Sequence, residues 1–146
     1  MTRLNGDVAI VTGAAQGIGA AYARGMAAEG ARVMIADVLE SDKLVAEIEG
    51  AGGVALGMVC DITDEILVAA LVAKTLAKFG QIDILVNNAA LFGDLKHTPF
   101  EDLGEDEWDT VMRVNVRGMW QVSKAVVPEM PSANTARSST SPRPPR

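Results

Sequence analysis

The chain has 146 residues, enough for one domain and too few for two of ordinary size. Hydrophobic residues make up 49% and aromatic residues only 4%, so the chain can bury a core and that core must be aliphatic. The net charge of -6 argues against a nucleic-acid or anionic-membrane surface. A single cysteine excludes an internal disulfide and fits a reducing compartment. Because no apolar run reaches the length of a signal peptide or a membrane span, we expect a cytoplasmic location.

Short runs of Val, Ile, Leu and Ala alternate with longer stretches of helical spacing, an order typical of βαβ units around a parallel sheet. The runs that predict strands are Val8–Val11, Arg32–Ala36, Val54–Val59 and Ile82–Val86. The stretches that predict helices are Ile18–Glu29, Ser41–Glu49 and about Thr63 to Phe79, with Ser41 and Thr63 as N-caps. The predicted fold is therefore α/β, a Rossmann-type doubly wound parallel sheet that is incomplete, with about four strands and a long helix after the fourth.

A loop over residues 89–104 leads into that long helix, which we expect to run from Glu105 to about Val127. Three- and four-residue spacing predicts one buried stripe along it. The residues of this stripe are Trp108, Met112, Asn115, Met119, Val122 and Val126. Residues 131–146 contain four prolines, six Ser or Thr and three Arg, and we expect them to be disordered. The chain thus divides into a folded body, residues 1–130, and a tail, residues 131–146.

The strongest motif is the turn TGAAQGIG at residues 12–19, which follows the first strand and opens the first helix. The chain must turn sharply there, admit a pyrophosphate against its backbone and pack the helix closely on the sheet, and glycine does this without a Cβ clash. Free N–H groups and the helix dipole then attract the phosphates. The alternative is a glycine-rich turn without a ligand. The residues that we expect to bind a dinucleotide here are Gly13, Ala15, Gln16, Gly17, Ile18 and Gly19.

Asp37 ends the second strand, 18 positions after Gly19. A carboxylate there can accept hydrogen bonds from both hydroxyls of an adenosine ribose, and it would repel a 2′-phosphate. Val38 beside it supplies no cation to offset that repulsion. The site therefore favours NAD over NADP, the alternative being that Asp37 is only a solvated residue at a strand end.

Two further polar groups follow the third and fourth strands, at the edge of the sheet where ligands of open α/β folds bind. Asp61, followed by Ile62, can bind the amino group of adenine. Asn88, followed by Ala89, can hold the backbone and the cofactor together. We therefore expect these four residues to bind the cofactor, although singly Asp61 could be a turn residue and the Asn pair the start of a loop.

Together these motifs resemble those of the classical short-chain dehydrogenases/reductases. Residues 12–19 resemble the family's TGxxxGxG turn and residues 87–90 its NNAG motif. Asp61 resembles the family's adenine-contacting acid, and Asn115 resembles the Asn of its catalytic tetrad. The resemblance covers residues 6 to about 130. Ala90 stands where the family usually has Gly, a departure that leaves both Asn positions intact.

The resemblance implies an NAD-dependent oxidoreductase that exchanges a hydride between nicotinamide and an alcohol or ketone, with the folded body as a partial NAD-binding domain. In the family, a Tyr acts as general acid or base beside a Lys that lowers its pKa, because an unperturbed phenol near pH 10 is a poor base. Of the catalytic set we assign only Asn115. The single tyrosine, Tyr22, is expected to be a packing residue, and Met26, not Lys, stands four positions on. We therefore expect the chain alone to be inactive.

The tail suggests a frameshift. The codons of residues 133–141, read one base earlier, permit a Gly-Lys-Ile-Val-Asn-Ile segment that resembles the family's fifth strand. If the strands follow the family order 3-2-1-4, the fourth becomes an open apolar edge, which invites aggregation. The long helix would also lose the neighbour that completes a dimer surface in the family. We therefore expect a homo-oligomeric parent and a fragment whose oligomerisation is impaired.

Two other interpretations stay open. A non-catalytic NAD-binding module or truncated subunit would have the same site without the activity. A Rossmann-type methyltransferase also favours an acid after its second strand, but the Thr-Gly start of the loop argues against it. The substrate is not identified beyond a small-molecule alcohol or carbonyl, although Phe92, Leu95 and Phe100 suggest an apolar rim. His97, the only histidine, has no neighbour that suggests a metal, and we expect no metal, nucleic-acid or membrane partner.

Overall fold

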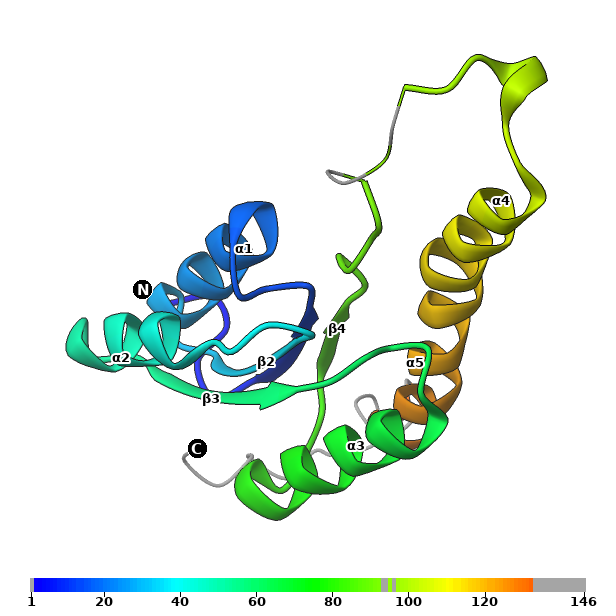
Figure 1. Ribbon diagram of the computed structural model, residues 1–146. Helices are drawn as coiled ribbons and strands as arrows, with labels where there is room; N and C mark the ends of the chain where they lie inside the picture. Colours follow the sequence, from blue (N-terminus) through cyan, green and yellow to red (C-terminus); the bar gives the residue numbers. More distant parts are fainter. Residues whose placement is uncertain (1, 93–94, 96, 133–146) are drawn as a thin grey trace.

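A computed structural model describes residues 2–92, 95 and 97–132. Their strands are β1 (Val8–Thr12), β2 (Arg32–Asp37), β3 (Val54–Val59) and β4 (Ile84–Val86). All pair in parallel, in the order β3-β2-β1-β4, which is the order that the family resemblance implied (Figure 1). Because the order reverses beside β1, the carboxyl ends of β1 and its neighbours form the crevice in which open α/β sheets bind ligands.

Helices cover both faces of the sheet, so the doubly wound prediction is confirmed. On one face lie α1 (Gly17–Ala28) and α2 (Asp42–Gly50), and on the other lie α3 (Glu65–Phe79) and α5 (Met119–Val126) (Figure 1). The two cores follow from the alternation of side chains along a strand. In β1, Val8 and Ile10 pack with the residues of α3 and α5, whereas Val11 packs with the alanines of α1.

The fourth strand is shorter than predicted. Ladder pairing begins at Ile84, although Ile82 is fully buried. At the intervening position, the Asp83 carboxylate accepts the N–H of Val8 at 2.8 Å. The Asp83 N–H also donates to the Val8 carbonyl at 2.9 Å, so the two residues are paired through one backbone bond and one bond to the Asp83 side chain.

The N-cap of α3 is Asp64, not Thr63 as predicted. The Asp64 carboxylate accepts the N–H groups of Ile66 and Leu67 at 2.8 and 3.2 Å. The Thr63 hydroxyl instead donates to Asp61 Oδ1 at 2.7 Å. A hydroxyl committed to that turn is not available to the helix, and the next residue supplies a carboxylate, which is an equally good cap.

The long helix is present but divided, as α4 (Glu105–Met112), a π-helical segment (Arg113–Gly118), α5 and a final 3-10 turn (Val127–Glu129). The predicted buried stripe is wrong as far as Met119, and only its last two residues are buried. Val122 and Val126 are 0% exposed, but Trp108 is 53% exposed. Met112 and Met119 are exposed as well.

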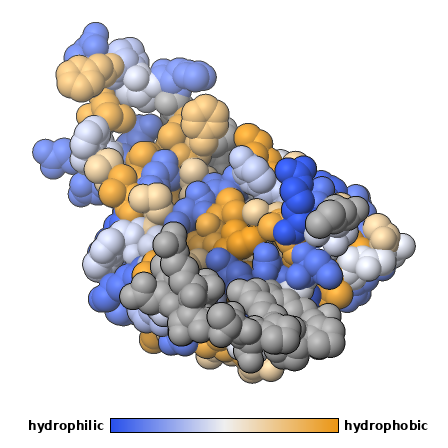
Figure 2. Space-filling view, turned by 180° about the vertical axis from the view of Figure 1, so that it is seen from behind, coloured by the Kyte–Doolittle hydropathy of each residue, from blue (hydrophilic) through white to orange (hydrophobic). Residues whose placement is uncertain are grey.

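The reason for this difference is the placement of the helix. Only α5 lies against α3, while α4 projects away from the sheet, where no described element covers it (Figure 1). Figure 2 shows the result from behind, with hydrophobic and hydrophilic residues side by side over the projecting arm. Periodicity marks a stripe, but burial requires a second surface.

Most of the tail that was expected to be disordered, residues 133–146, lies outside the described residues. Within residues 2–92, 95 and 97–132, no helix combines the length and apolarity needed to cross a membrane. The same ranges contain no group of three or more His, Cys, Asp or Glu side chains placed to hold a metal ion.

Candidate functional site

The glycine-rich loop joins β1 to α1 at the carboxyl edge of the sheet. Gly13 and Gly17 have φ of +63° and +59°, a left-handed conformation that side chains rarely adopt. A Cβ at Gly13 would lie 2.6 Å from Ala89 Cα. At Gly17, by contrast, it would meet no described atom within 4 Å, so the loop is open on that side. Gly13 therefore admits the segment after β4, and Gly17 makes the turn beside free space.

Gly19 seats α1 on that loop. A Cβ at Gly19 would contact the carbonyl of Gly13 and would lie 2.5 Å from Asn88 Nδ2 and 2.8 Å from Ala14 Cα. Glycine at this position is thus needed for packing between the helix and the loop, as the sequence indicated.

The opening of α1 presents backbone N–H groups to solvent. Gln16 is the N-cap, and its side chain makes no capping bond to the described residues. Gln16, Gly17 and Ile18 are exposed, and the Ile18 side chain is 70% exposed. The first N–H groups of a helix have no partner inside it, so this turn can receive an anion.

Asp37 reaches the same loop from the end of β2. Its Oδ2 accepts the N–H of Ala15 at 2.9 Å, and its Oδ1 accepts the N–H of Leu39 at 3.0 Å. The residue is only 9% exposed, so it is not simply a solvated strand-end acid. Each carboxylate oxygen can accept more than one hydrogen bond, so the carboxylate is fixed in place and still has acceptor capacity.

Asp61 lies beyond the end of β3, in a turn that its own side chain stabilises. Its Oδ1 accepts both the N–H and the hydroxyl of Thr63, at 2.8 and 2.7 Å. The preceding Cys60 donates its N–H to the carbonyl of Asp37 at 2.7 Å. The two acids predicted to bind adenosine are therefore joined through one backbone hydrogen bond.

Ile62 contributes differently from its neighbour. Its side chain is 5% exposed and belongs to the core beneath α3 and α5. Its carbonyl accepts a hydrogen bond from Gln121 Nε2 at 3.2 Å. Gln121, 7% exposed, was not singled out in the sequence, because one Gln on a helix carries no motif.

Asn88 and Thr12 join the loop after β4 to the glycine turn. Asn88 Nδ2 donates to the carbonyls of Thr12 and Gly13, at 3.1 and 2.9 Å. The Thr12 hydroxyl accepts the N–H groups of Asn88 and Ala89, both at 3.1 Å. The predicted backbone role of Asn88 is present in these bonds. Thr12, which was not among the predicted site residues, is the group around which these bonds converge.

Asn115 lies in the π-helical segment and faces the same loop. Its Oδ1 accepts the N–H of Leu91 at 2.7 Å, and its Nδ2 donates to the Leu91 carbonyl at 3.1 Å. The Asn115 amide thus bonds both the N–H and the carbonyl of Leu91, as a neighbouring strand would. Such π-helical turns occur often at functional sites, and here the segment carries the one predicted catalytic side chain that the sequence supplies.

A second bond ties the loop to the long helix. Asn87 Nδ2 donates to Ser123 Oγ at 3.0 Å, and that hydroxyl donates to the carbonyl of Met119 at 2.9 Å. Ser123 was not predicted, since its spacing from Asn87 in the chain gives no signal. The segment after β4 is thus held by the glycine turn on one side and by the long helix on the other.

The one cysteine lies beside this site. Cys60 is 1% exposed, and burial raises the pKa of its thiol to about 11, with smaller contributions from the charges of Asp61 and Asp64. The thiol is therefore protonated at neutral pH, and Cys60 is a core residue rather than a nucleophile.

The remaining candidate side chains lie at the surface. Phe92 and Phe100 are 84% and 89% exposed, so an apolar rim is not assembled over the described loop residues. His97 is exposed. Tyr22, expected to be a packing residue, is 49% exposed on α1, and the buried positions of that helix are Gly19, Ala20, Ala23 and Ala27.

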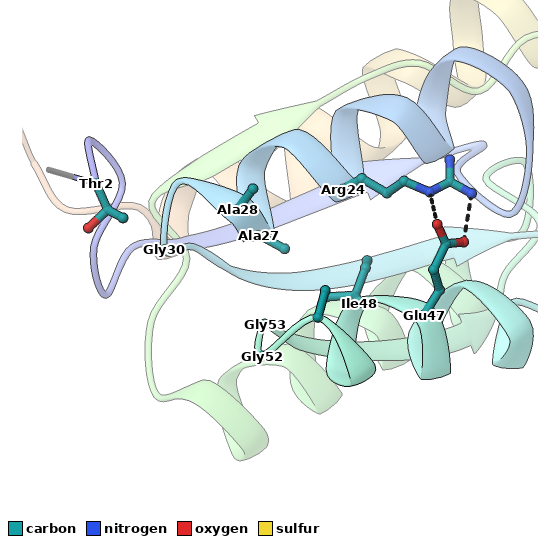
Figure 3. A pocket seen from close by; sticks show the side chains of 10 residues that line it. Thr2, Arg24, Ala27, Ala28, Gly30, Glu47, Ile48, Gly52 and Gly53 are labelled. Atoms are coloured by element: carbon teal, nitrogen blue, oxygen red, sulfur yellow. Dashed lines mark hydrogen bonds and ion pairs between the residues drawn. The ribbon is translucent and has the colours of Figure 1, made fainter.

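A cavity of ≈ 440 Å³ lies away from this edge, between the later turns of α1 and α2 (Figure 3). It is lined by Gly30, Ile48 and Gly53, among others, and the ion pair of Arg24 with Glu47 spans it at 2.7 Å. Their side-chain hydrogen bond raises the pKa of Arg24 and lowers that of Glu47. None of the predicted cofactor residues lines this cavity, so it is separate from the candidate site.

Comparison with known proteins gives one consistent result. The family model described as short chain dehydrogenase matches residues 7–138. Oxidoreductase UcpA of Escherichia coli is 41% identical over 131 residues, which cover 89% of this chain and 49% of that protein. The 3-oxoacyl-(acyl-carrier-protein) reductase FabG of Thermotoga maritima is 40% identical over 130 residues, covering 88% of this chain and 52% of FabG.

A solved structure supports the same relationship. A short chain dehydrogenase from Mycobacterium smegmatis superimposes with a TM-score of 0.82 at 36% identity, covering 88% of this chain and 54% of that one. The chain therefore spans about half the length of the relatives that it matches.

Proposed function

Because the chain belongs to the short-chain dehydrogenase family, we propose that it forms the NAD-binding half of an oxidoreductase. The observation that carries this proposal is the bond between Asp37 and the N–H of Ala15, 2.9 Å long. It places the carboxylate beside the open, left-handed turn at Gly17. Phosphate-binding amides and a ribose-binding acid are thus adjacent at the carboxyl edge of the sheet.

Each part of the site has a distinct role in this proposal. The N–H groups at the start of α1 bind the pyrophosphate, with Gly13, Gly17 and Gly19 allowing the close approach. Asp37 accepts the ribose hydroxyls, and Asp61 accepts the amino group of adenine. The loop that Asn88 fixes lies along the nicotinamide half.

The preference for NAD over NADP rests on charge. A 2′-phosphate on the ribose would face the Asp37 carboxylate. The residues that follow, Val38, Leu39 and Glu40, supply no positive charge. A phosphate there has repulsion and no compensating hydrogen bond, which disfavours NADP.

When bound, NAD supplies the hydride acceptor for oxidation of an alcohol, and its reduced form the donor for reduction of a ketone. Asn115 holds the loop at Leu91 through two hydrogen bonds, and we propose that it positions this wall of the reaction site. The sequence holds one tyrosine, Tyr22, with Met26 four positions on, so no Tyr-xxx-Lys pair is present for proton transfer. The chain alone is expected to bind NAD without catalysing the reaction.

A second candidate function is a non-catalytic NAD-binding module, because the bond between Asp37 and the N–H of Ala15 supports cofactor binding and does not itself require catalysis. The two candidates share the binding site and differ in activity. A steady-state assay with NAD and a panel of small secondary alcohols separates them. The protein assayed is this chain joined to the region by which its relatives extend beyond the match, and only the first candidate predicts turnover.

We propose that the parent protein is a homo-oligomer that associates through the long helix. One exposed face of the long helix carries Met112, Val116 and Trp120 together with Asp109 and Arg117. Two antiparallel copies bring the acid of one against the base of the other, as an isologous contact requires.

We also propose a cytoplasmic location, because the single cysteine is a buried free thiol and free thiols fit a reducing compartment.

Calorimetric titration with NADH and NADPH tests the binding proposal. We expect NADH to bind more tightly, and Asp37→Asn to weaken NADH binding about tenfold to a hundredfold because the ribose loses a charged acceptor. Asp42→Asn, at an exposed acid in the first turn of α2, is the matched control and should leave both affinities unchanged. Absence of NADH binding at millimolar concentration in folded protein would refute the proposal.

A further inference from the structure

We propose that Gln121 is a positioning residue that fixes the Asp61 carboxylate for recognition of the adenine base. The inference rests on the proposed NAD site and adds to it a residue far away in the chain. Gln121 lies on α5, and it is 7% exposed. A buried amide must be hydrogen-bonded to offset its desolvation, so its partner is an informative contact.

That partner is the backbone immediately after Asp61. Gln121 Nε2 donates to the carbonyl of Ile62 at 3.2 Å. On the other side of Asp61, the N–H of Cys60 donates to the carbonyl of Asp37 at 2.7 Å. Asp61 therefore stands between two anchored peptide groups, one held by the end of β2 and one by α5.

The side chain of Asp61 is fixed by the same arrangement. Its Oδ1 is occupied by the N–H and hydroxyl of Thr63, at 2.8 and 2.7 Å. Those bonds set the direction of the carboxylate relative to its own backbone, but they do not set the backbone relative to the sheet. Gln121 contributes to the second task by holding the Ile62 backbone, while the buried Ile62 side chain holds the same residue in the core.

Gly118 allows α5 to come close enough for this bond. A Cβ at Gly118 would lie 2.7 Å from Ile62 Cδ1 and 2.8 Å from Ile62 Cγ1. The helix therefore rests directly on the Ile62 side chain while Gln121, three residues later, reaches its carbonyl. Glycine and glutamine together hold the turn after β3 at a fixed place against the long helix.

The long helix that carries Gln121 also holds the other part of the proposed site. The same helix carries Asn115 and Ser123, which hold the loop after β4 at Leu91 and Asn87. Residues 115–123 thus connect the part of the site proposed for adenine with the part proposed for nicotinamide. Gln121 is the member of this set that acts on the adenine side.

The test uses the ratio of two affinities, which cancels general damage to the protein. NAD carries an amino group on its base, and nicotinamide hypoxanthine dinucleotide carries a carbonyl oxygen there, which the Asp61 carboxylate repels. We expect the chain to prefer NAD about threefold to tenfold, as one hydrogen bond allows. Gln121→Met, which keeps the length of the side chain and removes the donor, should reduce this preference to less than about twofold.

Two further variants serve as a positive comparison and a control. Asp61→Ala should abolish the preference in the same way. Val126→Ala, at a residue of α5 that is 0% exposed and has no bond to Ile62, should lower the melting temperature and leave the preference unchanged. If Gln121→Met does not fold, Gly118→Ala, which pushes the helix off Ile62, should reduce the preference through the same contact.

A readout independent of the cofactor separates failure of this inference from failure of the proposed function. Hydrogen exchange at the N–H of Thr63 reports the turn around Asp61, and we expect Gln121→Met to speed it about fivefold or more relative to Val126→Ala. If the wild type binds neither dinucleotide, the NAD proposal fails, and this exchange rate decides the positioning role. An unchanged preference for NAD, or unchanged exchange at Thr63, overturns the inference.

Discussion

Gly19 and Gly25 lie six residues apart on α1 and provide a matched test of how that helix is seated. A Cβ at Gly19 would contact the Gly13 carbonyl and would lie 2.5 Å from Asn88 Nδ2 and 2.8 Å from Ala14 Cα. A Cβ at Gly25 meets no described atom within 4 Å. The same substitution, glycine to alanine, should therefore have opposite effects at the two positions.

The magnitudes follow from the neighbours. At Gly19 the contacting atoms are backbone and an amide that is already bonded to two carbonyls, so they cannot move aside, and overpacking should cost about 1–3 kcal/mol. At Gly25, alanine should stabilise the helix by about 0.5–1 kcal/mol, because glycine loses more backbone entropy. For a domain of this size, 1 kcal/mol shifts the melting temperature by about 4 °C. Gly19→Ala should therefore lower it by about 4–12 °C and Gly25→Ala should raise it by about 2–4 °C.

Thermal unfolding followed by far-UV circular dichroism measures both shifts, and calorimetry adds the affinity for NADH below the transition. We expect Gly19→Ala to weaken NADH binding as well, because the displaced helix carries the phosphate-binding amides with it. Gly25→Ala should bind NADH as the wild type does. If Gly19→Ala melts at or above the wild-type temperature, α1 is not seated against the glycine turn and Asn88, and the packing argument fails.

Three further predictions concern the long helix and the buried thiol. Asn115→Ala removes both partners of the Leu91 backbone and should lower the free energy of unfolding by about 1–3 kcal/mol, whereas Asn115→Asp keeps the acceptor and should cost less; urea denaturation checks this. Val122→Ala should cost about 2 kcal/mol and Trp108→Ala less than about 0.5 kcal/mol, and equal losses in the same assay would contradict the described placement of α4.

The third of these predictions follows from the raised pKa of Cys60, about 11 in the folded chain. The folded state holds this proton more tightly than the unfolded state, so its stabilisation is complete below the unfolded pKa of about 8.5 and is lost as the pH rises towards 11. The unfolding free energy of the wild type should therefore fall more between those limits than that of Cys60→Ala, by no more than about 3.4 kcal/mol. Parallel curves for the two proteins would show that the thiol does not titrate in this way.

Local signals in the sequence were sufficient for the sheet and for the glycine turn. Buried strands are uniformly apolar runs, and Gly13 and Gly17 mark a turn that other residues rarely adopt, so both can be recognised without knowing any neighbour. Asp37 and Asp61 were identified because parallel strands bring their carboxyl ends to one edge. The choice of Thr63 as a cap failed for a local reason, since an adjacent Asp64 competes for the same role.

The sequence by itself determined the order of elements and the parallel sheet, because each strand and helix has its own local pattern and alternating strands and helices indicate parallel pairing. The position of the candidate NAD site followed from that sheet, since parallel strands bring their carboxyl ends to one edge. Only the tertiary structure decided which face of the long helix is buried, and it decided that Gln121 reaches Ile62 and that Ser123 meets Asn87. Those contacts join residues 36 to 59 positions apart. Helical periodicity fixes which side chains share a face, but the partner of that face depends on where the helix lies after the chain has folded.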